Sequence, residues 1–307
     1  MKTSFPPRSN RALPGLVLLF ILGMLAPATA QYAISLEIPR RTFVAMEPIV
    51  ATVTINNRSG ADVYLDAPGQ KRWLSFSISN TDGRTFPPLD IDGEQPFILK
   101  AGTTVSKKIR LTDSFALSEI GTYGMTASVI HPASTQYYES NRVQFTIVDA
   151  TVMWEEPVGV PEGFKRAGRI HNMAVLIHRD SDSTSLYARI VDERSRLPVA
   201  TFQLGPVSLV LDPQITIDSK NNLHVFFLAA PKIFCHALIS PDGELKKRVY
   251  YRELDGDRPA MITAANGDIS VRGGFYFDPS VVSDPSIPGL GEGTTPTRSV
   301  SDRPPGL

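Results

Sequence analysis

The 307-residue chain carries 31 Lys and Arg against 31 Asp and Glu, so its formal net charge at pH 7 is zero. This balance gives no electrostatic case for binding nucleic acid or an anionic membrane surface. The 42% of apolar residues excludes a disordered chain, and 25 Pro with 22 Gly favour many turns and few helices. The length favours two domains, each with its own core.

The first thirty residues have the pattern of an export signal. Lys2, Arg8 and Arg11 precede the apolar run Leu13–Leu25, and Ala28-Thr29-Ala30 has the small-x-small form of a cleavage site. The run has about 13 residues, fewer than the roughly 20 that a membrane span needs. We therefore expect residues 1–30 to be a cleaved signal peptide. The mature chain would be periplasmic or extracellular, without stable membrane insertion.

Cys235 is the only cysteine, so an intramolecular disulfide is impossible although export would permit one. The mature protein must therefore be stabilised by packing. An export signal without a disulfide favours a bacterial envelope protein.

Residues 31–150 alternate between apolar and polar with the period of a strand. Ile49, Ala51, Val53 and Ile55 share one face of one such run. Short runs of this kind, separated by turn residues, predict a β-sandwich. The expected strands, besides the run at Ile49–Ile55, are Ile34–Ile38, Val63–Leu65, Trp73–Ser79, Pro96–Leu99, Thr104–Leu111, Tyr123–Ile130 and Arg142–Val148.

The segment Glu119–Met125 (EIGTYGM) resembles the tyrosine corner of immunoglobulin-like domains, with Met125 in place of the disulfide cysteine. The resemblance implies a disulfide-free Ig-like sandwich in which the Tyr123 hydroxyl bonds to nearby backbone and its ring closes the core. Glu47-Pro48-Ile49, then Asn56-Asn57, then the late Gly-x-Tyr, are also similar to the layout of bacterial Ig-like proteinase-inhibitor domains. Proteinase inhibition is the specific function that this resemblance implies.

Residues 151–170 combine prolines, glycines and mixed charges, and we expect them to be a linker. Residues 171–279 then repeat a strand-turn-strand pattern: 46 residues separate Pro213 from Pro259, and 47 separate Tyr187 from Phe234. This spacing is typical of propeller blades, but about two and a half copies cannot close a ring. The domain is then either a small open stack of sheets or a sandwich, or it closes by association; we expect the former. Residues 280–307 hold little to bury and predict a disordered tail.

Within the repeats, the run Leu223–Leu228 is apolar on both faces, which predicts cover on both sides. The fold class expected overall is all-β: an Ig-like sandwich followed by a second antiparallel domain of propeller-like repeats.

One pair of residues offers a route to catalysis. If Leu228 pairs with Ile233 across the turn, His224 and Cys235 become diagonal neighbours on one face, close enough for a thiolate–imidazolium pair. The alternative is that Cys235 is a small buried apolar residue among Ile233, Ala237 and Ile239. With no third orienting residue, the second interpretation is preferred.

Metal ligation has little support. The spacings of His171, His178, His224 and His236 fit no compact ligand motif, and under the same pairing His224 and His236 point to opposite faces. The acidic turns Asp90–Glu94 and Asp180–Asp182 match no twelve-residue calcium loop and are expected to be solvated. We predict no catalytic, cofactor-binding or metal-binding residues.

The function expected is that of a non-enzymatic, exported binding or scaffold protein whose partner is a protein or a cell-envelope polymer. The long connections Asp66–Arg72 and Pro87–Gln95 would form its contact surface. The alternative is a carbohydrate-binding accessory module of an envelope hydrolase system. Its sugars would stack on aromatic side chains of the repeat domain, namely Tyr250, Tyr251, Phe275 and Tyr276.

Overall fold

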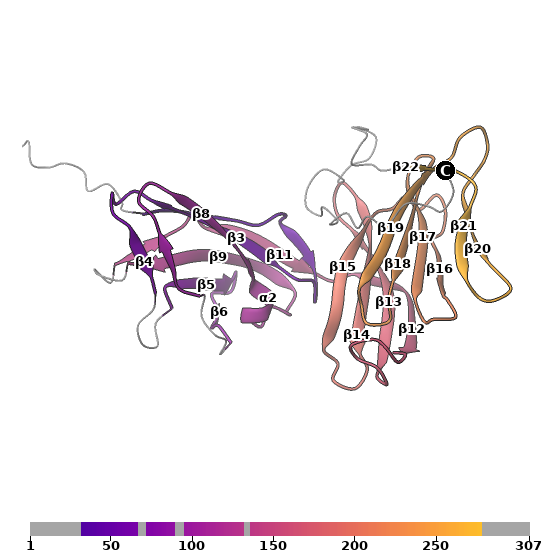
Figure 1. Cartoon of the computed structure of the whole chain (residues 1–307), viewed down its shortest axis with the longest axis horizontal. Coiled ribbons are helices and arrows are strands. Elements are labelled where there is room, and N and C mark those ends of the chain that lie inside the picture. Colours follow the sequence, from indigo (N-terminus) through magenta and orange to yellow (C-terminus); the bar gives the residue numbers. More distant parts are fainter. Residues whose placement is uncertain (1–31, 67–71, 90–94, 132–135, 278–307) are drawn as a thin grey trace, which may run out of the picture.

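The structure is a computed structural model that describes residues 32–66, 72–89, 95–131 and 136–277. Over these ranges the chain is all-β with one short helix, as predicted. Its main sheets have three, six, four and five strands and follow one another in a propeller-like arrangement of small sheets, grouped into two bodies (Figure 1). The expected signal peptide and tail lie outside the described residues. In the described ranges, no helix has the length and apolar content to cross a membrane.

The first body encloses one core between a three-stranded sheet, β1-β3-β8, and a six-stranded sheet, β2-β11-β9-β5-β6, with β10 beside β9. A separate pair, β4-β7, lies at its far end (Figure 1). The elements are β1 (Tyr32–Glu37), β2 (Thr42–Val44), β3 (Val50–Asn57), β4 (Val63–Leu65), β5 (Leu74–Asn80), β6 (Thr85–Phe86), β7 (Phe97–Leu99), β8 (Thr104–Arg110), α2 (Leu111–Ser114), β9 (Gly121–Ile130), β10 (Tyr137–Glu139) and β11 (Val143–Val148).

Tyr123 closes this core in the way its sequence context predicted. Its hydroxyl donates a 2.7 Å hydrogen bond to the carbonyl oxygen of Glu119, and its ring is stacked on Phe145 at 5.3 Å between centroids. Only 1% of Tyr123 is exposed, and Met125 beside it is fully buried. The hydroxyl is satisfied locally, so a polar side chain can fill an apolar interior at little cost.

The second body is built on two antiparallel sheets, one of four strands and one of five. Sheet D has the order β12-β13-β14-β15, and sheet E has the order β16-β17-β18-β19-β22. The strands are β12 (Thr151–Gly159), β13 (Ile170–Arg179), β14 (Thr184–Asp192), β15 (Pro198–Pro206), β16 (Gln214–Ile217), β17 (Leu223–Ala230), β18 (Ile233–Ile239), β19 (Leu245–Arg252), β20 (Ala260–Thr263), β21 (Ile269–Arg272) and β22 (Phe275–Phe277).

The expected linker at 151–170 is wrong over its first half, because residues 151–159 form strand β12. The expectation rested on the prolines and glycines of this segment. Pro157 is nevertheless tolerated in a strand, because β12 lies at the edge of its sheet, where the missing N–H costs no hydrogen bond between strands. Val158 and Val160 are buried, and Trp154 packs against the core of the second body. Only two residues, Asp149 and Ala150, separate β11 from β12.

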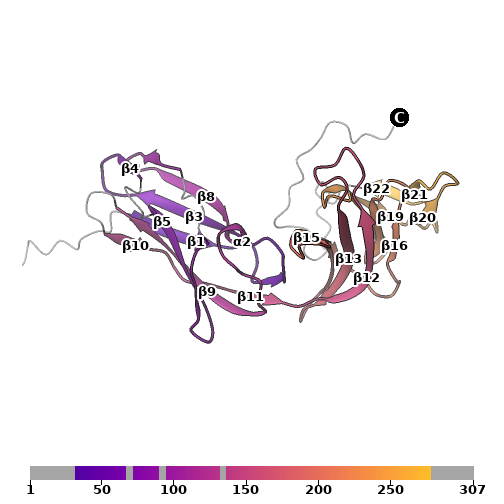
Figure 2. The same ribbon diagram turned by 90° about the horizontal axis from the view of Figure 1, so that it is seen from below.

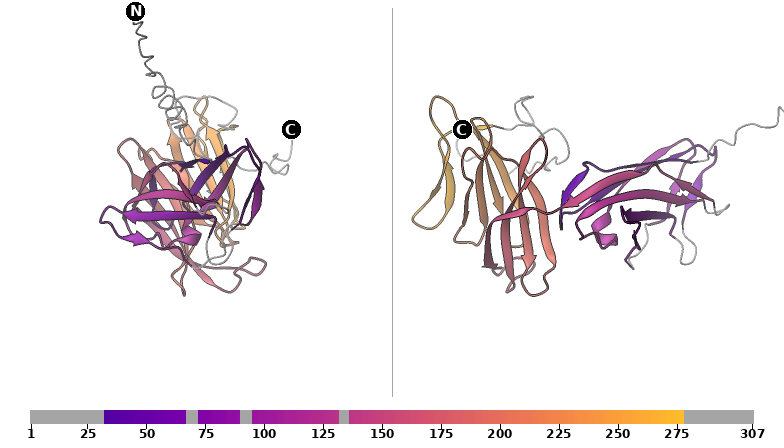
Figure 3. Two further views of the ribbon diagram at one scale, coloured as in Figure 1. Left: turned by 90° about the vertical axis from the view of Figure 1, so that its left-hand side faces the viewer. Right: turned by 180° about the vertical axis from the view of Figure 1, so that it is seen from behind.

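Sheets D and E stack face to face through one apolar core (Figure 2). Sheet D contributes Val175, Leu186 and Ala188, among others, and sheet E contributes Val225 and Phe227. All eight residues of β17 are buried, which confirms that this strand is covered on both faces. The expected third repeat forms no further large sheet. Its β20–β21 hairpin lies over the outer face of sheet E, and β22 extends the edge beside β19 (Figure 3).

A buried junction joins the two bodies. On the apolar side, Val44, Val148 and Ala150 pack against Ala174, Leu176 and Tyr187 on the outer face of sheet D. On the polar side, the Arg40 guanidinium donates to the Tyr187 hydroxyl at 3.3 Å and to the Gln203 side-chain oxygen at 3.4 Å. Arg189 donates in the opposite direction, to the carbonyl oxygen of Ala45 at 3.1 Å.

The centre of the junction is an ion pair between Arg40 and Glu47. Glu47 also accepts a hydrogen bond from the Val44 backbone N–H, and its side chain is only 5% exposed. Burial raises the pKa of Glu47 although Arg40 and these hydrogen bonds act to lower it. Glu47 of the Glu-Pro-Ile motif therefore holds Arg40, the residue that bonds to the second body.

We predict that Arg40→Ala will lower the free energy of unfolding by about 2–4 kcal/mol at pH 7, because it leaves a buried carboxylate without its counter-ion. The difference in unfolding free energy between the wild type and the variant should shrink as pH falls from 7 toward 5. In the variant the folded state takes up a proton on Glu47 at a higher pH than the unfolded state does. Urea unfolding at several pH values measures both effects.

Arg41→Ala is the matched control, since Arg41 is exposed and adjacent in sequence. It should change the unfolding free energy by no more than about 0.5 kcal/mol. Equal losses for the two variants would contradict the role given to the Arg40–Glu47 pair.

Candidate functional site

The structure separates the two residues of the predicted Cys235–His224 pair. Cys235 lies opposite Phe227 and points into the core between sheets D and E, whereas His224 lies opposite Leu238 on the outer face of sheet E. Cys235 is fully buried among apolar neighbours that include Ile233, Ala237 and Ile239. The preferred interpretation, a small buried apolar residue, is confirmed.

A one-residue bulge accounts for the error. The pairing runs Leu228 with Phe234 and then Ala230 with Ile233, which leaves Ala229 without a partner. The prediction paired Leu228 with Ile233 instead. Because side chains alternate with a period of two, this slip of one residue exchanges the faces of every side chain on one strand relative to the other.

The true register brings His224 and His236 together, where the prediction had set them apart. Their rings stack at 5.2 Å between centroids, and His224 Nδ1 lies 3.0 Å from His236 Nε2. The other nitrogen of His224, Nε2, lies 3.2 Å from the Asp218 carboxylate. The two histidines are 4% and 5% exposed, so the chain Asp218–His224–His236 is a buried polar network on the outer face of sheet E.

Electrostatics favour the neutral form of this histidine pair. Burial lowers the pKa of His236 to about 4, with His224 and Lys247 adding to the effect. Burial also lowers the pKa of His224, against the opposing influence of Asp218. Burial alone would raise the pKa of Asp218, but hydrogen bonds from Asn222, His224 and Lys220 outweigh it, and the pKa is lowered.

Local sequence explains the position of Asp218. It opens the turn between β16 and β17, where its carboxylate accepts hydrogen bonds from the backbone N–H groups of Lys220 and Asn222, both at 2.8 Å. Asn221 occupies the left-handed region at φ 64°, which asparagine tolerates. The sequence pattern gave no sign that this carboxylate is a partner of His224.

A third buried histidine, His171, ties the two sheets together. His171 is fully buried on β13, and its Nδ1 donates to the carbonyl oxygen of Pro241 in the β18–β19 turn at 2.7 Å. Its Nε2 lies 3.9 Å from Asp192, which also binds Arg169 at 2.8 Å. The Arg169 hydrogen bond, with those from Ser195, holds the pKa of Asp192 well below its usual range. This network links sheets D and E.

The residues that the structure describes do not gather into a metal site. In the ranges that it describes, no group of three or more His, Cys, Asp and Glu side chains is placed to hold an ion. Asp180 and Asp182 lie in an exposed turn, and the Ser181 backbone N–H donates to Asp180 at 2.7 Å. Residues 90–94, the other acidic turn considered for calcium, lie outside the described residues.

The proposed sugar-stacking aromatics do not form one platform. Tyr250 is buried in the core between the sheets, while Tyr251 belongs to the outer face. Tyr276 pairs with Tyr251 across the edge and is 62% exposed, but Phe275 lies opposite Arg252 in alternate register. Only Tyr251 and Tyr276 share a face.

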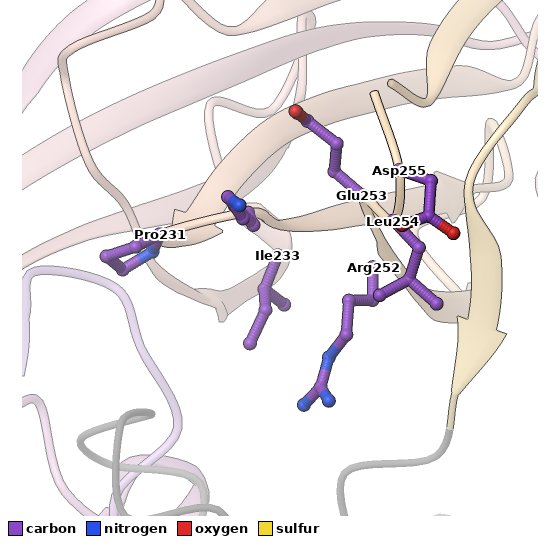
Figure 4. Close-up of a pocket in the computed structure, with 7 residues that line it drawn as sticks. Pro231, Ile233, Arg252, Glu253, Leu254 and Asp255 are labelled. Atoms are coloured by element: carbon purple, nitrogen blue, oxygen red, sulfur yellow. The ribbon is translucent and has the colours of Figure 1, made fainter. Parts of the chain in front are cut away.

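An open depression of about 310 Å³ lies at the tip of the β17–β18 hairpin. Its lining mixes both signs of charge, with Lys232 and Arg252 beside Glu253 and Asp255. Figure 4 shows the side chains of Arg252 and Glu253 pointing in opposite directions. The ionisable groups therefore do not converge on a common point, as a catalytic site requires.

One exposed apolar pair lies at the far end of the first body. Tyr64 on β4 and Ile98 on β7 are direct cross-strand partners. They are 55% and 61% exposed, so they form an uncovered pair on one face of the small β4-β7 sheet. This sheet adjoins the loops that were expected to make contacts, although residues 67–71 and 90–94 of those loops lie outside the described residues.

Comparisons with known proteins identify no family. No model of a protein family matches the chain, and no curated protein matches it. Among solved structures, it is similar to the sporulation control protein Spo0M from Bacillus subtilis at 8% sequence identity and a TM-score of 0.27. That likeness covers 55% of this chain and 83% of the other. A TM-score this low carries no argument about the fold or the function of this chain.

Full burial raises the pKa of the Cys235 thiol to about 12, and we predict that it will not react in the folded protein at pH 8. The thiolate is the reactive form, and at that pH only about one molecule in ten thousand would carry it. Ellman's reagent should therefore report one thiol only after denaturant is added. Rapid reaction of the folded chain, at the rate of a free thiol, would contradict the buried position.

Proposed function

We propose that this chain is a non-enzymatic binding or scaffold protein that contacts a protein partner through the far end of its first body. The uncovered Tyr64–Ile98 pair carries the proposal. A tyrosine beside an aliphatic side chain provides a rigid apolar contact with a polar edge, the composition favoured at the centres of protein interfaces. Export to the bacterial envelope, as the N-terminal pattern predicts, belongs to the same proposal.

The ionisable side chains support a binding role over a catalytic one. Cys235 is enclosed in apolar packing, His224 and His236 bond to each other and to Asp218, and His171 bonds to Pro241. Each is held by partners inside the fold, away from the exposed surface at β4 and β7.

The junction supports a scaffold role. A two-residue connection, a buried apolar contact and the bonds of Arg40 and Arg189 hold the second body against the first. A partner bound at β4 and β7 would then stand at a fixed distance from the second body, whereas a flexible linker would let that distance vary.

Two more specific expectations, an Ig-like first body and proteinase inhibition, are part of this proposal. The tyrosine corner at Tyr123 favours an Ig-like sandwich for the first body. Proteinase inhibition follows only from the sequence resemblance. Glu47, part of the Glu-Pro-Ile motif that carries this resemblance, is buried at the junction. An inhibitory contact would therefore have to be made by the loops beside β4 and β7.

The test is capture of partners from a bacterial envelope extract by the immobilised full chain, with Tyr64→Ser/Ile98→Ser as the variant. A specific partner should lose at least about tenfold in retention, because the two substitutions remove apolar area from the centre of the contact. Tyr276→Ser, a single exposed aromatic at the other end of the protein, is the control and should leave retention unchanged.

A glycan array separates the alternative function. Glycan binding that Tyr276→Ser abolishes and Tyr64→Ser/Ile98→Ser leaves intact would replace the protein-binding proposal with the carbohydrate-binding one. Retention of the same protein partner by both variants would also contradict the proposed surface.

A further inference from the structure

The β20–β21 hairpin is attached to the rest of the protein mainly by side chains. Its two strands pair with each other as a separate two-stranded sheet and share no ladder with sheet E. Met261 and Val271, direct cross-strand partners, pack on Phe226, Leu228 and Phe234 of the outer face. Most of the hairpin is exposed, and Ile262 on the same strand as Met261 is 43% exposed. Figures 1 and 3 show it as a distinct outer layer.

Both ends of the hairpin are built as tight turns. On the C-terminal side, Gly273 and Gly274 have φ of 78° and 69°, a conformation that favours glycine. On the N-terminal side, Asp255 and Gly256 also have positive φ, at 51° and 79°. The Asp257 carboxylate joins the two ends, since it accepts a 3.0 Å hydrogen bond from the Gly274 backbone N–H. The two ends of the hairpin are therefore held together at one narrow base.

The hairpin crosses the face that holds the buried histidine pair. At one end it contacts Phe226 and Phe234, and Arg258 lies 5.5 Å from the Phe234 ring. At the other end, Asp268 lies 3.9 Å from Lys220 in the turn that also carries Asp218. His224 and His236 are on this face between the two contacts, and they are nearly inaccessible.

We propose that the β20–β21 hairpin is an acid-released strap, in which the His224–His236 pair senses protons and release uncovers the apolar outer face of sheet E. The uncovered face would be centred on Phe226, Leu228 and Phe234. The inference is independent of the binding function proposed for the first body, because it concerns the opposite end of the molecule.

Proton counting explains why acid should act here. With Asp218 ionised, His224 Nε2–H donates to the carboxylate, so in the neutral pair His236 Nε2–H donates to His224 Nδ1. One added proton can be accommodated: His224 becomes an imidazolium that donates to both neighbours, and His236 shifts its proton to Nδ1. A second proton puts N–H on both facing nitrogens, breaks the 3.0 Å bond and places two cationic rings in contact.

The surrounding charges do not cancel the repulsion between two protonated histidine rings. Asp218 neutralises one imidazolium, but Lys247 on β19 adds to the repulsion at His236. The strands β16 and β18 present no other charged side chain. Charged groups at the two ends of the hairpin are Lys220 and Asp268 at one end, and Asp257 and Arg258 at its base.

The sign of the pH dependence follows. Both histidines have lowered pKa values in the closed state, that of His236 about 4. In the open, hydrated state they return toward the ordinary value near 6.5. The open state therefore binds more protons between these limits, and the closed state loses stability as pH falls from about 6.5 to about 4.

Hydrogen–deuterium exchange of the full chain tests the proposal. After correction for intrinsic exchange rates, the opening equilibrium of residues 260–272 should rise between about tenfold and a hundredfold per pH unit below 6.5, according to whether one or two protons drive it. Amides of β17, β18 and the first body should stay protected, and binding of the apolar dye ANS should rise over the same range.

His236→Phe keeps a stacked ring but takes up no proton. In this variant the opening equilibrium of the hairpin should change by less than tenfold per pH unit. His178→Gln removes a histidine from β13 in sheet D and should leave the wild-type dependence intact. Met261→Ser weakens the strap without changing the histidines, and should produce at pH 7 the exchange and dye binding that acid produces in the wild type.

Three results would overturn the proposal. The first is a wild-type hairpin as well protected at pH 4.5 as at pH 7. The second is loss of protection throughout the second body at the same pH as the hairpin. The third is an undiminished acid response in His236→Phe. If that variant does not fold, the wild-type and Met261→Ser measurements decide the matter.

Discussion

The register between β17 and β18 determines the character of the second body. These strands lie at the centre of sheet E, and the unpaired Ala229 sets which of their residues face inward. Inward-facing positions are apolar and build the core shared with sheet D, including Phe227 and Cys235. Outward-facing positions carry the two histidines beside Phe226 and Phe234. Pairing these strands one residue out of register would turn one strand over relative to the other, so that one of the two histidines would enter the main core and apolar residues of the same strand would leave it. Register is therefore strongly specified here.

Cover on both faces of β17 also organises the layers of the molecule. Sheet D covers the inner face, and the first body in turn packs on the outer face of sheet D. The β20–β21 hairpin covers the outer face of sheet E. The contacts that hold these layers differ in extent. The core between sheets D and E is large and apolar, and the junction combines an apolar contact with an ion pair. The hairpin is held by few side chains. Local opening is expected first where buried area is least.

The buried histidines and Glu47 are held by partners inside the fold. Each buried histidine has a hydrogen-bond partner, and Glu47 is buried together with Arg40. Such pairs contribute little net stability compared with apolar packing, but losing one partner is costly. They therefore fix geometry, between the bodies at Glu47, between the sheets at His171, and within sheet E at His224. The Tyr64–Ile98 pair differs, because it is apolar and uncovered.

The sequence by itself determined the all-β class, the approximate positions of most strands, the local hydrogen bond of Tyr123 and the apolar character of both faces of β17. Each of these follows from periodicity or from contacts a few residues apart. Only the tertiary structure decided that residues 151–159 form a strand, that Arg40 meets Glu47 beside Tyr187, and that His224 faces His236 rather than Cys235. The Arg40 contacts with Tyr187 and Gln203 join residues about 150 positions apart, and the histidine contact depends on a single-residue bulge. A period-two pattern carries no information about either, because it is unchanged when a strand pairs one residue further along.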